Sequence, residues 1–223
     1  MDRQRARALI VLAFDTTLDA CSAAVLDGER VLACRSEPMA RGHQERLAPL
    51  VREVMAEAGV GFATLQRIGV TVGPGSFTGL RVGLAFAKGL GLALQRPVIG
   101  VGTLEALAAT AGIGRVAAVV DAKRGQFWVQ TFYAGQALTA PAAHEPEAVS
   151  LALTDDRPEV LVGSGAGRFA CSLPGVRTDP RTVADPAAIA RLATVAPEPT
   201  APPRPLYLRA PDARLPGGVT PGA

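Results

Sequence analysis

Runs of apolar residues separated by polar turns divide the first hundred residues into alternating strands and helices. The run Leu9–Phe14 has no polar position, which is typical of a strand covered on both faces. It ends at Asp15, and two further runs follow that Asp27-Gly28 can join as a hairpin. The strands expected in this half are Leu9–Phe14, Ala20–Leu26, Arg30–Arg35, Ile68–Val72 and Pro97–Val101.

Residues His43–Ala58 show the period of an amphipathic helix. Its apolar positions recur at three- and four-residue intervals, while arginines and glutamates occupy the opposite side; the apolar set is Leu47, Leu50, Val51, Val54, Met55 and Ala58. Gly59 follows as a helix-ending residue. We therefore expect one face of this helix to be buried against something apolar.

The stretch Ser76–Leu94 predicts a second, unusual helix. Ser76 follows a Gly-Pro-Gly turn and is a suitable N-cap, because its hydroxyl can accept from a free backbone N–H. Inside the helix, Gly79, Gly83 and Ala87 recur every four residues and line one face. Each interior glycine costs about 1 kcal/mol relative to alanine. A bare stripe of this kind favours close approach of another backbone, either from the same chain or from another subunit.

The second half of the chain repeats the pattern of the first. Ala117–Asp121 is another apolar strand that ends in aspartate, and a short loop leads to a β-rich run, Gln126–Tyr133. Further elements are expected at Leu104–Ala111 (a helix capped by Thr103), Glu159–Val162 (a strand) and Asp185–Ala196 (a helix). The repetition indicates two similar lobes, with residues 1–102 in the first and 103–196 in the second.

Residues 197–223 form a tail rich in proline and glycine, which we expect to be extended or partly disordered except where Leu206-Tyr207-Leu208 pins it. The whole chain has 223 residues, 48% hydrophobic and 19% charged, with a net charge of +3. These values suit a globular protein and do not favour a strong nucleic-acid surface. We expect no signal peptide and no apolar run of membrane-spanning length.

Several motifs of the chain carry residues that could support chemistry. The turn at Gly73 lacks the lysine of a phosphate-binding Walker loop, and Thr78 occupies the third glycine position of a dinucleotide fingerprint. Asp15, Thr16 and Asp121 at strand ends are candidates for nucleotide or magnesium binding, and capping of local turns explains them equally well. His43 has Leu47, not histidine, one helical turn later, so no metal site is expected. Ser76 lacks the sequence context of a catalytic serine.

Taken together, these residues resemble the TsaB (YeaZ) family of bacterial tRNA threonylcarbamoyladenosine biosynthesis proteins. The resemblance covers most of residues 8–209 and rests on the segments LAFDTTLDACSAAVL, HQERLAPLV, GVTVGPGSFTGLRVGLAFAKGLGLAL, VVDAKRGQFWVQTFY and PLYLR. It implies an α/β, two-lobed fold of the actin and Hsp70-like ATPase class (the ASKHA, ribonuclease H-like architecture) with duplicated lobes. The arginines before Leu9 and the chain after Arg209 lie outside it.

The resemblance also implies a function. It indicates a non-catalytic subunit required to place threonylcarbamoyl on adenosine 37 (t6A) of ANN-decoding tRNAs. The family pairs with the transferase TsaD through the first two helices of each subunit, so the implied partner-binding residues here are Leu47, Leu50, Val51, Val54, Ser76, Gly79, Gly83 and Ala87. The ATPase TsaE binds that pair, and TsaC supplies threonylcarbamoyl-AMP. No cofactor is implied, although ATP or ADP at the subunit interface stays open.

Two other functions remain open at this stage. The chain could be an independent ATP-dependent enzyme of the actin-like class that uses Asp15 and Asp121, or a peptidase acting on TsaD. Self-association of the isolated chain and direct contact with tRNA also stay open. A cytoplasmic location is expected.

Overall fold

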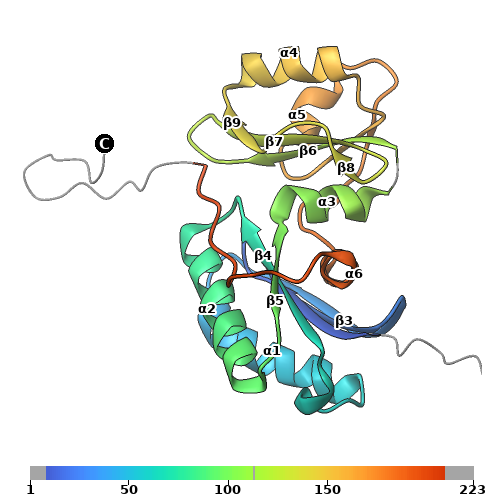
Figure 1. Cartoon of the computed structure of the whole chain (residues 1–223). Coiled ribbons are helices and arrows are strands. Elements are labelled where there is room, and N and C mark those ends of the chain that lie inside the picture. The colour runs from blue at the N-terminus through green and yellow to red at the C-terminus, as the bar shows by residue number, and fades with distance from the viewer. Residues whose placement is uncertain (1–8, 113, 209–223) are drawn as a thin grey trace, which may run out of the picture.

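Two mixed β-sheets form the framework of the chain (Figure 1). The computed structural model describes residues 9–112 and 114–208. The first sheet has the strand order β3-β2-β1-β4-β5. Its strands are β1 (Ile10–Asp15), β2 (Ala20–Asp27), β3 (Arg30–Pro38), β4 (Arg67–Gly73) and β5 (Val98–Gly102).

The second sheet repeats the first in order and direction. Its path is β8-β7-β6-β10-β11, and β9 also pairs with β7. In each sheet an antiparallel hairpin, β1–β2 or β6–β7, is followed by a parallel neighbour, β4 or β10. The strands are β6 (Arg115–Asp121), β7 (Phe127–Tyr133), β8 (Gln136–Ala137), β9 (Ala142–His144), β10 (Val160–Val162) and β11 (Arg177–Thr178). The predicted duplication of lobes is confirmed.

Helices cover both sheets and separate them (Figure 1). Helices α1 and α2 cover the outer face of the first sheet, α4 and α5 that of the second, and α3 and α6 lie between the sheets. Their bounds are α1 (His43–Glu57), α2 (Phe77–Leu94), α3 (Thr103–Ala111), α4 (Pro146–Asp156), α5 (Ala166–Ala170) and α6 (Pro186–Val195), with a short 3-10 turn at Phe62–Thr64.

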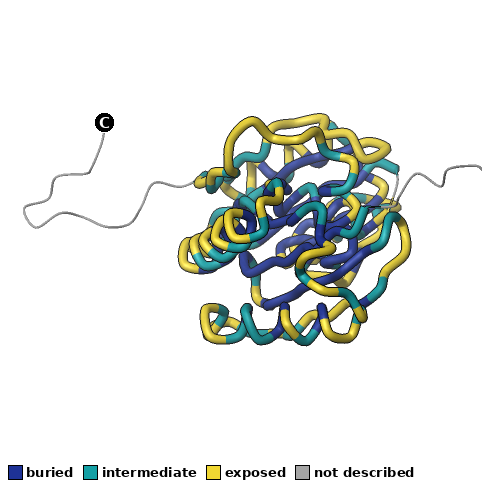
Figure 2. Tube along the Cα trace, turned by 60° about the horizontal axis from the view of Figure 1, so that its bottom comes forward, coloured by how far each residue is buried: buried dark blue, intermediate teal, exposed yellow. Residues whose placement is uncertain are grey.

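The burial of β1 shows why the run Leu9–Phe14 has no polar position. Leu12 and Phe14 face α1 and α2, while Val11 and Ala13 face α3 and α6. All four side chains are fully buried. Figure 2 shows the same pattern along the trace, with buried strands inside and exposed positions on outer helices and loops. Burial on both faces removes the alternation that a half-exposed strand would show.

Helix α6 belongs to the second half of the sequence but packs on the first sheet. It contacts β1, β2 and β4, and the side chain of Ala193 comes so close to β4 that a Cβ at Gly69 would lie 2.9 Å from it. The predicted lobe boundaries at residues 102 and 196 divide the chain by sequence order and assign α6 to the second lobe. In the structure, α6 packs on the sheet of the first lobe. The expected cap at Thr103 is wrong: Gly102 is the N-cap of α3, and the N–H of Gly102 donates to Glu105.

The described part of the tail runs along the first lobe. The N–H of Leu206 donates to the carbonyl of Val72 over 2.7 Å, and the ring of Tyr207 lies 5.3 Å from that of Phe77. This confirms that Leu206-Tyr207-Leu208 pins the tail. The predictions for residues 1–8 and 209–223 lie outside the described residues.

The glycine face of α2 packs against the loop between β1 and β2. The Thr16 hydroxyl donates to the carbonyl of Gly79 over 2.7 Å, and the N–H of Ser76 donates to the carbonyl of Thr17 over 2.7 Å. A Cβ atom at Gly79 would overlap the Thr16 carbonyl oxygen, and one at Gly83 would lie 2.7 Å from the Thr16 hydroxyl. The space along the stripe is thus taken by the backbone and side chain of Thr16 from the same chain.

Helix α2 is also long and apolar enough, by length and composition alone, to cross a membrane. Its 18 residues have a mean hydropathy of 1.3, and 33% of them are buried. This corrects the expectation that no apolar run reaches membrane-spanning length. Arg81 and Lys88 interrupt the run, but the mean hydropathy of the helix stays within the range of membrane-spanning helices. Core helices of globular proteins share this property, and one such helix is weak evidence for a membrane span.

We predict that alanine substitutions at two glycines of α2 change stability in opposite directions. Gly79→Ala should lower the free energy of unfolding by roughly 1–3 kcal/mol, because the added methyl meets backbone. Gly89→Ala should raise it by about 0.5–1 kcal/mol, because a Cβ there meets nothing within 4 Å and alanine favours the helix. Urea unfolding of both variants measures this, and stabilisation by Gly79→Ala would contradict the packing described.

Candidate functional site

The side chains predicted to bind a partner are core residues of this chain. Leu47, Leu50, Val51 and Val54 of α1 are at most 1% exposed and pack on the first sheet, and Ala87, Gly79 and Gly83 of α2 are buried too. Ser76 is exposed and caps α2, its hydroxyl accepting from the N–H of Gly79 over 3.3 Å. This corrects the interpretation of the bare stripe as an open docking face: its close-approach partner is the β1–β2 loop.

A second set of small and apolar residues lies on the outward side of α2. Leu92 is 83% exposed, and Ala85 and Gly89 are exposed at helical intervals on the same side. Space around Gly89 is open. This face could not be predicted from the sequence, because both faces of α2 carry small residues and their spacing does not reveal which face points inward. One residue in the sequence could have indicated this face: Leu92 is apolar and does not lie on the glycine stripe.

Charged side chains tie α1 to the edge strand β3. Arg46 donates two hydrogen bonds to Glu37 and two to Glu53, over 2.6–2.8 Å, and Arg35 pairs with Glu53 and Glu57. Hydrogen bonds from Arg46 hold the pKa of Glu37 and of Glu53 below the usual range. These carboxylates are therefore engaged within the chain and fix α1 beside β3.

Asp15 lies at the centre of a buried hydrogen-bond network. One of its carboxylate oxygens accepts from the N–H of Thr17 (2.8 Å), the Thr17 hydroxyl (2.6 Å) and the Thr71 hydroxyl. The Thr17 hydroxyl also lies 3.2 Å from that of Thr103 at the start of α3. Asp15 is only 1% exposed. The network joins β1, β4 and α3, so it stabilises the junction of the two lobes.

Asp121 lies in a different environment from Asp15. It is partly exposed and lines a cleft of about 160 Å³ between the lobes, together with Thr17, Ser76, Ser164 and other residues. One of its carboxylate oxygens accepts from the N–H of Lys123 over 2.7 Å, and its own N–H donates to Ser164. Neither Asp15 nor Thr16 lines this cleft. It is smaller than the roughly 300 Å³ at which ligand pockets usually begin.

His43 and Ser76 line one cavity, although 33 positions separate them in sequence. The cavity measures about 270 Å³ and lies at the N-termini of α1 and α2. The Nε2 atom of His43 is buried and has no hydrogen-bond partner among the described residues. Within residues 9–112 and 114–208, no three His, Cys, Asp or Glu side chains gather so as to hold a metal ion.

Comparison with known proteins places these features in a family. The model of the family described as TsaD, tRNA N6-adenosine threonylcarbamoyltransferase, matches residues 36–160, which is more than half of the chain. An uncharacterised protein of Mycobacterium tuberculosis is 35% identical over 208 residues, covering 92% of this chain and 93% of its own length.

Named relatives match a shorter stretch. The Escherichia coli tRNA threonylcarbamoyladenosine biosynthesis protein TsaB is 37% identical over 125 residues, so the match spans about half of each protein, 54%. Among solved structures, YeaZ from Pseudomonas aeruginosa superposes with a TM-score of 0.72 at 32% identity, covering 83% of this chain and 90% of that one.

The duplicated two-lobed fold is shared more widely. Component A of (R)-2-hydroxyglutaryl-CoA dehydratase from Acidaminococcus fermentans superposes with a TM-score of 0.51 at 12% identity, which shows the fold alone. This supports the predicted actin-like ATPase fold class. The family match and the full-length relatives lead to one conclusion: the chain belongs to the TsaB (YeaZ) family, within the larger family described by the TsaD threonylcarbamoyltransferase model.

Proposed function

We propose that this chain is a non-catalytic subunit required for threonylcarbamoylation of adenosine 37 in ANN-decoding tRNAs, and that it acts by forming a heterodimer with the transferase TsaD. The observation that carries the proposal is the state of Asp15: the carboxylate that an actin-like ATPase would use on magnesium is 1% exposed, and one of its oxygens accepts three hydrogen bonds from its own chain. On this proposal TsaE binds the heterodimer, TsaC supplies the activated group, and the complex works in the cytoplasm.

The position of the family's metal site supports a role without chemistry. The transferase is expected to carry a His-x-x-x-His pair on the helix equivalent to α1. Here His43 is followed by Leu47, which is 1% exposed and packs in the core. A leucine cannot ligate a metal, so this helix contributes packing where the transferase has a metal ligand. Any ATP or ADP in the complex is then expected at the subunit boundary.

The outward side of α2 supplies the docking surface in this proposal. Ala85, Gly89 and Leu92 are exposed, and open space around Gly89 lets another backbone approach closely. Exposed apolar groups on a helix gain free energy when a partner covers them, about 25 cal/mol for each Å². The buried glycine stripe supports the proposal indirectly, because it holds α2 rigidly on the sheet.

Reconstitution of the reaction tests the proposal. TsaD, TsaC, TsaE, ATP, threonine, bicarbonate and an ANN-decoding tRNA are combined with and without this chain, and modified adenosine is measured. We expect product only when the chain is present. Product at the full rate without it would rule the proposal out.

A leucine at Gly89 should weaken the heterodimer without damaging the monomer. The added side chain fills the space needed for close approach, so the dissociation constant for TsaD should rise by about tenfold or more. Affinity is measured by calorimetry and fold by circular dichroism. Gly167→Leu in α5 is the matched control, because Gly167 is also exposed with open space around it. Equal affinity of the Gly89→Leu and Gly167→Leu proteins would contradict the assigned surface.

In calorimetry, the isolated chain should show no micromolar binding of Mg-ATP. Asp15→Ala should lower the free energy of unfolding by about 3 kcal/mol, because it leaves buried hydroxyl and amide donors unpaired. Asp121→Ala, at a partly exposed position, should change stability much less. Micromolar ATP binding that Asp121→Ala abolishes without unfolding would favour the ATP-dependent enzyme instead.

A further inference from the structure

Residues 199–208 of the tail are built into the first lobe at two glycines. A Cβ at Gly73 would lie 2.6 Å from the carbonyl oxygen of Leu206, and a Cβ at Gly100 would lie 2.9 Å from Pro203. Only glycine lets the tail come this close to the end of β4 and the middle of β5. The first sheet therefore leaves room for residues 199–208, which we name the strap.

Contacts of the strap are concentrated at its far end. Leu206 forms its backbone hydrogen bond with Val72, the residue that leads into the Gly-Pro-Gly turn before α2. Tyr207 packs on Phe77, the first residue of α2. The guanidinium of Arg81 also lies over the Phe77 ring, 3.8 Å from its centre. Arg81 Nε is 3.5 Å from the Tyr207 hydroxyl.

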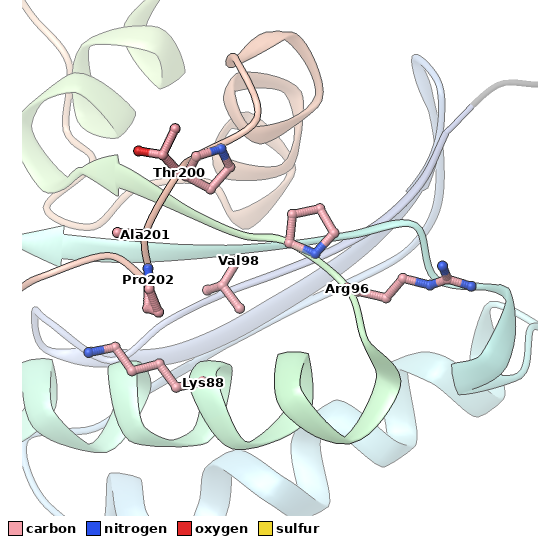
Figure 3. A pocket seen from close by; sticks show the side chains of 8 residues that line it. Lys88, Arg96, Val98, Thr200, Ala201 and Pro202 are labelled. Atoms are coloured by element: carbon pink, nitrogen blue, oxygen red, sulfur yellow. The ribbon is translucent and has the colours of Figure 1, made fainter.

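The near end of the strap stands off from the helix. A hollow of about 220 Å³ lies between Pro199–Pro202, the start of β5 and Lys88 of α2. Figure 3 shows Lys88 reaching from α2 toward Pro202 across this hollow, while Arg96 extends away from it. The strap therefore holds α2 through its first turns and leaves the C-terminal half of the helix uncovered.

We propose that Tyr207 is a positioning residue: through its stack on Phe77, the strap holds the first turns of α2 against β4 and so sets the position of the outward face used for docking. The inference rests on the proposed function, since it assigns the strap a part in the same heterodimer. Phe77 and Tyr207 are 42% and 40% exposed, so their pairing is accessible and separable from the core. Aromatic pairs of this geometry contribute beyond the area they bury.

Hydrogen exchange of the full chain tests the intramolecular part. In Tyr207→Ala, the amides of Leu206 and of the first turns of α2, such as Leu80, should exchange about tenfold faster than in the unsubstituted protein. Tyr207→Phe should restore slow exchange, because the ring pair remains. Tyr133→Ala is the matched control: Tyr133 is 53% exposed on the second sheet and should leave α2 unchanged.

Binding to TsaD tests the second part. Tyr207→Ala should raise the dissociation constant about tenfold, whereas Tyr207→Phe and Tyr133→Ala should not change it. Unchanged exchange in α2, unchanged affinity, or loss of the whole fold in Tyr207→Ala would each overturn the inference, because a positioning residue must act on α2 and be separable from the core. If the unsubstituted chain fails to bind TsaD, the proposed function fails, and exchange alone decides whether the strap holds α2.

Discussion

Contact between the glycine face of α2 and the β1–β2 loop is the constraint on which the rest of the structure depends. The Thr16 carbonyl takes the space that a side chain at Gly79 would need, and the Thr16 hydroxyl bonds back to the same residue. One residue further along the loop, Thr17 pairs with Asp15 and lies beside Thr103. A single loop thus fixes α2, the proposed docking helix, on one side and the junction of the lobes on the other.

This arrangement supports the proposed role without ATPase chemistry. Nucleotide-binding folds of this class need free carboxylates and open glycine-rich loops where phosphates approach. Here one oxygen of the buried Asp15 carboxylate accepts three hydrogen bonds from its own chain, and Gly79 and Gly83 of α2 make room for the backbone and side chain of Thr16. The aspartate and glycines therefore hold the chain rigid, and the outer faces of the helices remain available for the proposed docking.

Much of the fold could be predicted because strong apolar runs and helical periods mark its elements. The β1 run, the α1 period and the Ser76 cap all appear in the structure close to their expected bounds. Helix α4 was missed because Pro146–Asp156 has two buried positions, Val149 and Leu153, and a polar remainder. The return of α6 to the first sheet could not be predicted, since small side chains such as Ala193 fit either lobe. The spacing of the α2 glycines predicts that they share one face of the helix, but only the packing shows that this face points inward.

Radical footprinting of side chains tests most directly the claim that the outward face of α2 carries the function. Leu92 is 83% exposed in the isolated chain, and Leu151 and Val195, at 69% and 77%, report on distant surfaces in the same sample. When TsaD is added, oxidation of Leu92 should fall several-fold while that of Leu151 and Val195 stays constant. Equal oxidation of Leu92 with and without TsaD, in a sample where the heterodimer has formed, would contradict the account.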